Sequence, residues 1–252
     1  MRVLVTGSAG HLGEALMRTL PQGGHVPVGL DIAAGRWVDV VGSVDDRELI
    51  RNAIAGADAV IHTATLHKPH VGTHAREQFV QTNVTGTLVP LEEAVRAGVG
   101  AFVFTSSTSV FGRASRPGPD KPAAWITEDV EPQVRNIYGA SKQAAEALCE
   151  LVARDDALPT VVLRTSRFFP EPDDLAQRRD AHDDLSLKVS ELLYRRCDLE
   201  DVVSAHLLAI QRAPGLGSLR ALRDGRDPRS EIARAVGAKG YHDRTVGVYT
   251  RR

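Results

Sequence analysis

The chain has 252 residues; 42% of them are hydrophobic, 25% are charged, and the formal net charge at pH 7 is −1. This composition is typical of a globular protein with a full core, and the near-zero net charge excludes a global electrostatic attraction to nucleic acid or to an anionic membrane surface. No apolar run approaches the ~20 residues of a membrane span, so we expect neither nucleic acid nor membrane as a partner.

The cysteine content and the first residues both favour the cytoplasm. Cys149 and Cys197 are the two cysteines, and neither belongs to a paired motif. Two free thiols are most simply explained by a reducing compartment. The chain starts directly with an apolar strand and lacks the long apolar segment and cleavage site of a signal peptide, so we expect a cytoplasmic protein.

Short apolar runs of strand length alternate with helical patterns through the first two thirds of the chain. The runs that favour strands are residues 3–5, 25–30, 59–61, 101–105 and 160–163, and the patterns that favour helices are residues 12–20, 47–55, 83–97 and 138–154. Continuous apolar runs are typical of buried parallel strands, and strand–helix alternation implies right-handed crossovers. The sequence therefore predicts an α/β fold, a Rossmann-type doubly wound parallel sheet, over residues 1–168.

This pattern weakens after residue 168. Pro170-Glu171-Pro172 interrupts the alternation, residues 173–184 are highly charged, and residues 198–212 favour one further amphipathic helix. The chain after about residue 213 has poor periodicity, which is typical of an irregular docked tail or of partial disorder. We expect residues 169–252 to form a small, reduced C-terminal substrate-binding region.

Three glycines follow the first predicted strand. Gly7, Gly10 and Gly13 would allow a tight turn, close approach of the backbone to a pyrophosphate, and close packing of a helix on a strand. The next helix would offer free N–H groups and the positive end of its dipole to the phosphates. A plain tight turn is the alternative, but the position directly after the first strand favours dinucleotide binding.

Asp31 follows the second predicted strand, eighteen residues after Gly13. A carboxylate there can accept hydrogen bonds from ribose hydroxyls and would repel a 2′-phosphate, which favours NAD over NADP. Arg36 is close in sequence and could pair with a 2′-phosphate, so NADP stays open.

Tyr138 and Lys142 are one helical turn apart, so their side chains share one face of the predicted helix. A nearby ammonium favours the phenolate and would lower the tyrosine pKa from its ordinary value of about 10. Such a tyrosine can exchange a proton with a substrate hydroxyl or carbonyl. The spacing alone also fits a solvated surface pair.

Five motifs carry a family resemblance, because they occur in order and at suitable distances. They are Thr6-Gly7-Ser8-Ala9-Gly10-His11-Leu12-Gly13, Val60-Ile61-His62-Thr63-Ala64, Asn83-Val84-Thr85-Gly86-Thr87, Phe104-Thr105-Ser106-Ser107 and Tyr138-Gly139-Ala140-Ser141-Lys142. Over about residues 1–212 the chain resembles the extended short-chain dehydrogenase/reductases, the NAD-dependent epimerase/dehydratase family, whose members act largely on sugars and sugar nucleotides.

The resemblance implies a catalytic hydroxyl at Ser107, an acid/base at Tyr138, and a lysine at Lys142 that binds the nicotinamide ribose and lowers the tyrosine pKa. Thr108 is the runner-up to Ser107, and Ser106 and Ser109 are further alternatives in the same loop. The implied NAD contacts are Gly7, Gly10, His11, Leu12, Gly13, Asp31, Ser43, Val44, Thr63, Ala64, Thr105, Tyr138 and Lys142.

Several basic or imidazole groups occur in segments expected near the substrate: His67, Lys68, His70, His74, Arg113 and Arg167. Arg167 could clamp a carboxylate or phosphate with two hydrogen bonds. We therefore expect an anionic or carbohydrate-like substrate that contacts Thr65, His67, Ser107, Thr108 and Arg167. The three histidines have helical spacing, but Pro69 interrupts it and neither cysteine nor carboxylate completes a set, so we predict no metal site.

These observations predict an NAD(P)-dependent oxidoreductase that interconverts a secondary alcohol and a ketone on a small-molecule substrate. A short C-terminal region suits such an enzyme; uronate dehydrogenases are similar in length and in having Pro-Glu-Pro after the sixth strand. A sugar or sugar-nucleotide epimerase or dehydratase with recycled NAD is the alternative, and a catalytically idle nucleotide-binding scaffold is a further one. The resemblance also implies that helices 83–97 and 138–154 could form a homodimer interface.

Overall fold

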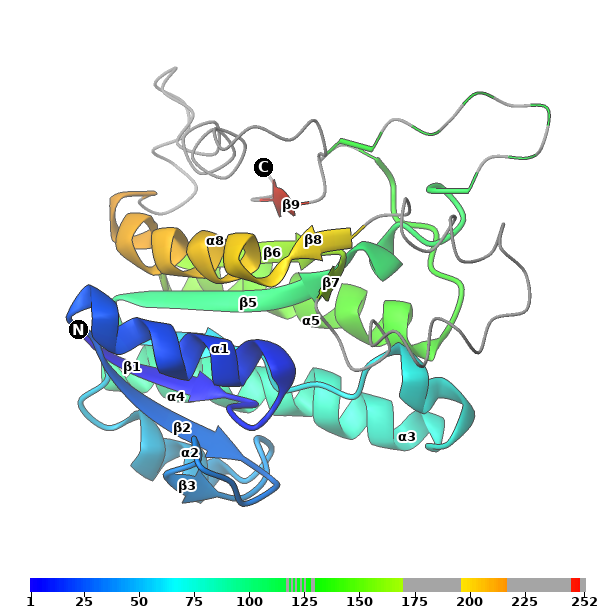
Figure 1. The fold of residues 1–252 in the computed structure, drawn as a ribbon. Coiled ribbons are helices and arrows are strands. Elements are labelled where there is room, and N and C mark those ends of the chain that lie inside the picture. The colour runs from blue at the N-terminus through cyan, green and yellow to red at the C-terminus, as the bar shows by residue number, and fades with distance from the viewer. Residues whose placement is uncertain are drawn as a thin grey trace.

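A seven-stranded sheet forms the centre of the protein, seen in a computed structural model that describes residues 1–116, 118, 120, 122, 124, 126–127, 130–169, 196–216 and 246–249 (Figure 1). Its strand order is β3-β2-β1-β4-β5-β6-β9. The strands are β1 (Arg2–Thr6), β2 (Val26–Asp31), β3 (Val40–Val41), β4 (Ala59–His62), β5 (Ala101–Ser107), β6 (Thr160–Thr165) and β9 (Val246–Tyr249). The first six run parallel, whereas β9 pairs with β6 in the antiparallel direction.

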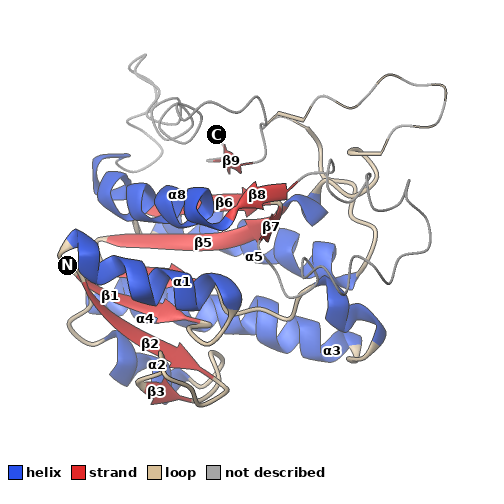
Figure 2. Ribbon diagram, viewed as in Figure 1, coloured by secondary structure: helices blue, strands red, loops and turns tan. Residues whose placement is uncertain are grey.

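Helices cover both faces of this sheet (Figure 2). On one face lie α1 (His11–Thr19) and α8 (Leu199–Arg212); on the other lie α2 (Arg47–Ile54), α4 (Gly86–Ala97) and α5 (Ile137–Asp155). The short helix α3 (Arg76–Phe79) precedes α4. A second, two-stranded parallel sheet consists of β7 (Arg167–Phe169) and β8 (Arg196–Asp198). The predicted doubly wound Rossmann-type fold is therefore confirmed.

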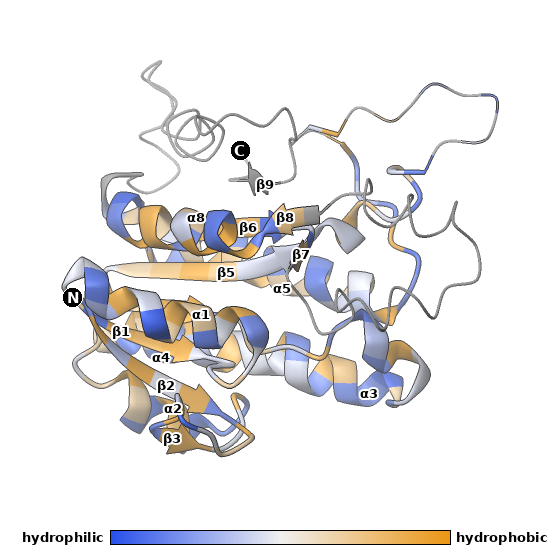
Figure 3. Cartoon of the chain, viewed as in Figure 1, coloured by the Kyte–Doolittle hydropathy of each residue, from blue (hydrophilic) through white to orange (hydrophobic). Residues whose placement is uncertain are grey.

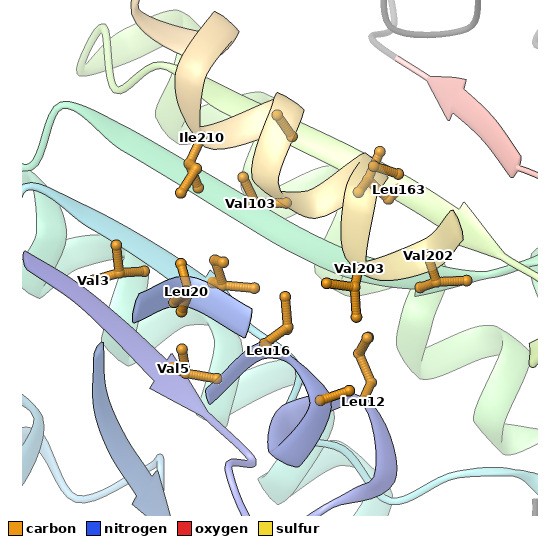
Figure 4. Packing of buried hydrophobic residues seen from close by; sticks show 14 of the residues in the cluster. Val3, Val5, Leu12, Leu16, Leu20, Val103, Leu163, Val202, Val203 and Ile210 are labelled. Carbon is orange, nitrogen blue, oxygen red and sulfur yellow. The ribbon is translucent and has the colours of Figure 1, made fainter. Parts of the chain in front are cut away.

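The alternating direction of strand side chains supplies each helical layer with its own core. In β1, Val3 and Val5 face α1 and α8, whereas Leu4 packs with α2 and α4. The strands and the inner helix faces are correspondingly apolar (Figure 3). Figure 4 shows the side chains of α1 and α8 gathered over the sheet, Leu16 among them. Leu16 has no exposed surface, and replacing such a leucine by alanine typically costs about 2–5 kcal/mol.

Polar N-cap residues fix where two of the helices, α2 and α5, begin. The carboxylate of Asp46 accepts from the N–H groups of Glu48 and Leu49, each at 3.1 Å, at the start of α2. Asn136 accepts from the N–H of Gly139 at 2.9 Å and so starts α5, which places Tyr138 in the first turn. These caps satisfy N–H groups that a helix leaves without an internal partner.

The structure differs from the sequence-based expectation in several elements, since the short helix α3 and the strands β7, β8 and β9 were not predicted. The two-residue strand β3 was not predicted, because its apolar run is too short to give a pattern. The helix expected over residues 83–97 begins as a π-helical segment, Val80–Thr85, and becomes α-helical at Gly86. Asn83 lies in this π-helical segment, and such bulges are frequent at functional sites.

The C-terminal region is described in part. Helix α8 corresponds to the predicted helix 198–212, with Asp198 as its N-cap, and it packs against α1 and β5. Residues 170–184, and the tail from residue 217 onward except β9, lie outside the described residues. The boundary near residue 168 therefore stays a prediction. Among the described residues, we find no helix with both the length and the apolar character that a membrane span requires.

Candidate active site

The glycine-rich turn between β1 and α1 packs too closely for side chains at two positions. Gly7 has a φ of 74°, and a Cβ there would lie 2.7 Å from the backbone nitrogen of Ala64. A Cβ on Gly13 would lie 2.0 Å from the carbonyl oxygen of Gly7. A Cβ on Gly10 would meet the same oxygen at 3.2 Å, a milder conflict. The turn is therefore a close-packed cradle whose shape depends on glycine.

The start of α1 suits an anionic group. Gly10 is the N-cap of this helix and has no side chain that could accept from the N–H groups of the first turn. Those N–H groups and the positive end of the helix dipole form a ready site for a phosphate. These features fit the pyrophosphate of a dinucleotide.

Asp31 lies at the end of β2, beside this turn. One carboxylate oxygen accepts from the N–H of Ala9 at 3.0 Å, and the other accepts from the N–H of Ala33 at 2.9 Å. Each oxygen keeps a further lone pair for a ribose hydroxyl. Arg36 lies with its guanidinium 4.9 Å from the ring centroid of Trp37. The structure thus brings Asp31 to the turn as the sequence predicts.

The end of β4 is tied to the same turn. The hydroxyl of Thr63 donates to the carbonyl of Thr6 at 2.7 Å, and the N–H of Ala64 donates to the hydroxyl of Thr6 at 3.4 Å. His62 is fully buried between the hydroxyls of Thr6 and Thr87, with ring-nitrogen distances of 2.7 and 3.2 Å. Burial lowers the pKa of His62 to about 3, so this imidazole is a neutral structural group.

Ser107 and Tyr138 meet at the carboxyl end of the sheet. Ser107 is the last residue of β5, and its side chain lies close enough to Tyr138 to act on the pKa of the phenol. The serine oxygen accepts from the N–H of Ser109 at 3.1 Å. Tyr138 is 8% exposed, and burial raises its pKa above the ordinary value, although the nearby Ser107 side chain lowers it in part.

Lys142 occupies the next turn of α5 and is 2% exposed. Its ammonium donates to the carbonyl oxygen of Thr105 at 2.8 Å and lies 4.6 Å from the ring centroid of Phe104. Burial lowers the pKa of Lys142 to about 7. The pKa of Tyr138 is raised and not lowered as expected, because desolvation of the phenol outweighs the effect of Ser107. The ammonium of Lys142 donates to Thr105.

The alternatives to Ser107 in the same loop are placed differently. Ser106 donates to the carboxylate of Glu146 at 2.5 Å, on the far side of the strand from Ser107. Thr108 and Ser109 belong to a short 3₁₀ helix, Thr108–Val110, that begins directly after Ser107. Ser107 is thus the hydroxyl of this loop that acts on the phenol of Tyr138.

Asn83 is a structural residue whose contacts the sequence did not reveal. Its amide nitrogen donates to the carbonyl of Leu66 and to the hydroxyl of Ser141, each at 2.9 Å. Its amide oxygen accepts from the hydroxyl of Thr65 at 3.0 Å and from the N–H of Leu66 at 2.8 Å. Asn83 therefore fixes the segment after β4 to α5, next to Lys142.

Three histidines of the predicted substrate region stack in a row. The ring centroids of His67 and His70 are 4.4 Å apart, and those of His70 and His74 are 4.8 Å apart. Burial lowers the pKa values of His67 and His70, and each is lowered further by the next imidazole in the row. The charge of Lys142 also lowers the pKa of His67, which places this row within electrostatic reach of the catalytic candidates.

Some of the other predicted site residues are buried in the core, and others are exposed. Leu12 and Val44 are core residues, so only their backbones remain for a cofactor. His11 is exposed and its ring lies 5.8 Å from that of Phe168. Arg167 is exposed at the start of β7. Within the described ranges, no group of three or more His, Cys, Asp or Glu side chains is arranged to hold a metal ion.

Comparison with known proteins adds a family to this geometry. Residues 3–218 match the model of the NAD dependent epimerase/dehydratase family. A UDP-glucose 4-epimerase of Neisseria meningitidis serogroup C is 30% identical over 186 residues, which are 67% of this chain and 52% of that protein. The chain spans about half the length of the curated relatives that it matches.

Solved structures agree with this assignment. A short-chain dehydrogenase/reductase superfamily protein from Agrobacterium tumefaciens, with bound NAD, matches with a TM-score of 0.67 and 28% identity, covering 83% of this chain and 73% of its own. A mutated uronate dehydrogenase has a TM-score of 0.67 and 25% identity, covering 86% of this chain and 71% of its own. Together with the glycine cradle and the Ser107–Tyr138–Lys142 cluster, these matches show that the chain belongs to the NAD-dependent epimerase/dehydratase family.

Proposed function

We propose that this chain is an NAD-dependent oxidoreductase that interconverts a secondary alcohol and a ketone on a small anionic, carbohydrate-like substrate. One observation carries the proposal: the Ser107 side chain lies close enough to Tyr138 to act on its phenol, and the buried Lys142 follows one helical turn away. A paired hydroxyl and phenol at the carboxyl end of a parallel strand are suited to bind and protonate a carbonyl oxygen.

The cofactor proposal rests on the turn after β1. Gly7, Gly10 and Gly13 would hold the pyrophosphate with the N-terminus of α1, and Asp31 would accept from the adenosine ribose. NAD, when bound, supplies the hydride acceptor. A carboxylate at Asp31 favours NAD over NADP, because it would repel a 2′-phosphate.

The protein's own part is to hold the substrate oxygen and to move a proton at that oxygen. Ser107 Oγ would donate a hydrogen bond to it, and Tyr138 Oη would transfer the proton. Because burial keeps the Tyr138 pKa raised, the phenol is neutral at pH 7 and ready to act as the acid in ketone reduction. Alcohol oxidation, which needs the phenolate, should accordingly accelerate as the pH rises.

The row of three imidazoles supports an anionic substrate. Protonated imidazoles in this row would repel one another, so an adjacent carboxylate or phosphate would relieve that repulsion and raise the lowered pKa values of His67 and His70. Arg167 would pair with the same anion from β7. The uronate dehydrogenase among the structural neighbours makes uronates the first compounds to test.

A sugar or sugar-nucleotide epimerase or dehydratase is the second candidate, because a UDP-glucose 4-epimerase is among the relatives. Such enzymes return the hydride to the same molecule, so NAD stays bound through the cycle. A catalytically idle scaffold fits less well, since it would have no use for the Ser107–Tyr138 pair.

Substrate screening tests the proposal. Purified protein is incubated with NAD and with uronates, aldoses or simple secondary alcohols, and NADH absorbance is followed, with Tyr138→Phe as the matched inactive variant. Net NADH formation that the variant lacks supports the dehydrogenase. Conversion of a UDP-sugar without net NADH, together with nicotinamide retained after dialysis, would support the epimerase instead. Full activity in the Tyr138→Phe variant would contradict the catalytic assignment.

Three further expectations belong to this proposal. Residues 169–252 would supply a small substrate-binding region, the protein would act in the cytoplasm, and α4 and α5 would pair two copies into a homodimer. Leu151 on α5 is 42% exposed, an apolar surface that a second copy would cover. Light scattering of wild type and of Leu151→Asp tests the dimer: a monomer in both samples would contradict it.

A further inference from the structure

A buried ion pair lies directly behind the catalytic candidates. The carboxylate of Glu146, on α5, accepts from Arg164 Nε at 2.9 Å and from Arg164 Nη2 at 2.7 Å. The side chain of Glu146 is 12% exposed and that of Arg164 is 4% exposed. Ser106 donates to the same carboxylate at 2.5 Å.

The ion pair shares a helix face with the catalytic candidates. Tyr138, Lys142 and Glu146 follow at intervals of four residues on α5, so their side chains line one face in successive turns. Burial lowers the pKa of Lys142, whereas Cys149 and then the carboxylate of Glu146 raise it and favour the ammonium form. Glu146 is thus the counter-charge of a lysine that would otherwise lose its proton readily.

The ion pair also anchors the strand that carries Ser107. Ser106, held by Glu146, precedes Ser107 in β5, and its carbonyl accepts from the hydroxyl of Thr165 in β6 at 3.0 Å. The guanidinium of Arg164 lies 4.9 Å from the ring centroid of Phe111, which ends the loop after Ser107. One carboxylate therefore connects α5 with the ends of β5 and β6.

Stability alone is a weak reason for such a pair, because desolvation of two buried charges offsets most of their attraction. We propose that Glu146, fixed by Arg164 and Ser106, is a positioning residue that keeps Lys142 charged and holds the Ser107 strand end at Tyr138. The inference rests on the proposed function only in taking Ser107, Tyr138 and Lys142 as the reacting site.

Other charged or titratable groups face Lys142, and their effects on its charge must be distinguished from the effect of Glu146. On α5 these are Tyr138 and Cys149; β4 contributes His62, and the 3₁₀ helix after β4 is preceded by His67. The two histidines have lowered pKa values and are neutral near pH 7, and burial raises the pKa of the Cys149 thiol, which stays neutral as well. Glu146 is therefore the charged group that acts on Lys142 in this range.

The decisive measurement is the titration of Lys142 itself. The chain has five lysines, so ¹³Cε-lysine NMR resolves them, and Lys142→Arg identifies the Lys142 signal. We expect its midpoint near pH 7 in the wild type and about one pH unit lower in Glu146→Gln, which keeps the size of the side chain but removes its charge. Glu150→Gln, one turn further along α5, is the matched control and should leave the midpoint unchanged.

Glu146→Asp is the second variant, for the case that Glu146→Gln does not fold. It keeps the negative charge but places it one methylene further from its partners. A smaller decrease of the midpoint is expected there. An unchanged Lys142 midpoint in whichever of the two variants is folded would overturn the proposal.

This titration needs no substrate, so its outcome is independent of the proposed reaction. Once a substrate is found, the pH profile gives a second readout. In ketone reduction, which uses the neutral phenol, the alkaline loss of kcat/KM that follows deprotonation of Lys142 should move to lower pH in Glu146→Gln and stay in place in Glu150→Gln. A uniform loss of kcat/KM at every pH would indicate a merely structural role and would also overturn the charge argument.

Discussion

The carbonyl oxygen of Thr105 accepts a hydrogen bond from the ammonium of Lys142 at 2.8 Å, and the hydroxyl of the same threonine lies 2.8 Å from Nε2 of His206. Thr105 belongs to β5, two residues before Ser107, whereas Lys142 and His206 come from helices on opposite faces of the sheet. The strand that carries Ser107 is therefore held from both faces close to its reactive end.

Tyr138→Phe should reduce turnover by about 10²–10⁴-fold, the range typical of a lost acid/base group. The ring keeps its packing, and only the hydroxyl near Ser107 is lost, so the free energy of unfolding should change by about 1 kcal/mol. NADH affinity, measured by fluorescence titration, should stay within a factor of two. A parallel loss of NADH binding would show that the tyrosine is mainly structural.

Ser107→Ala and Ser109→Ala separate two hydroxyls of one loop. The Ser107 side chain acts on Tyr138, whereas the backbone N–H of Ser109 donates to the Ser107 hydroxyl. We expect about a hundredfold loss of kcat in Ser107→Ala and near wild-type kcat in Ser109→Ala. Equal losses in both variants would favour a general disturbance of the loop.

Asp31→Asn should weaken the preference for NAD over NADP. The amide can still accept from a backbone N–H, but it no longer repels a 2′-phosphate. We expect the ratio of the NADP and NAD dissociation constants to fall about tenfold, or ~1.4 kcal/mol. Asp39→Asn is the control, since the carboxylate of Asp39 bonds the N–H of Gly29 within the fold. An unchanged ratio in Asp31→Asn would remove Asp31 from the cofactor site.

Gly13→Ala should lower the free energy of unfolding by about 1–3 kcal/mol, the usual cost of forcing extra volume into packed structure. The new Cβ would lie 2.0 Å from the carbonyl oxygen of Gly7, so the turn must move. Gly72→Ala is the matched control, because its Cβ would enter open space. Urea unfolding measures both, and equal stabilities would contradict the close packing described for the turn.

Stability should fall on acidification because His62 and His206 are buried in the neutral form. Their folded pKa values, about 3 and about 4, lie below the ordinary value of 6.5. Below about pH 6.5 the unfolded chain binds protons that the folded chain excludes, so stability is full above that pH and falls towards pH 4. From pH 7 to pH 5 each histidine should cost about 2 kcal/mol.

Urea unfolding at several pH values tests this dependence. His62→Gln should flatten the pH dependence by the share of one histidine, whereas His11→Gln, an exposed position, should leave it unchanged. A wild-type stability that is constant between pH 7 and pH 5 would rule out the neutral buried state.

Local signals explain what the sequence could predict. The glycines at 7, 10 and 13 and the pair Tyr138 and Lys142 are each a short-range pattern that can be read from neighbouring residues, and the alternation of apolar runs predicts the parallel sheet. The two-residue strand β3 gives no such pattern, because it is defined by its pairing with β2.

The contacts that sequence could not supply join distant elements. Glu146 is one turn beyond Lys142, a spacing that could have drawn attention to it, but its partners Arg164 and Ser106 are fixed only by the pairing of β5 with β6. The direction of the Lys142 ammonium likewise depends on the position of α5 over β5. Lysine was therefore expected to act on the phenol, whereas the structure directs it to Thr105.

Thr105 connects the two helical layers of the fold. Lys142 of α5 donates to its carbonyl, and its hydroxyl is bonded to His206 of α8, so helices on both faces of the sheet meet at one residue of β5. A shift of either helix that kept its hydrogen bond would have to move Thr105, which lies two residues before Ser107 in the same strand.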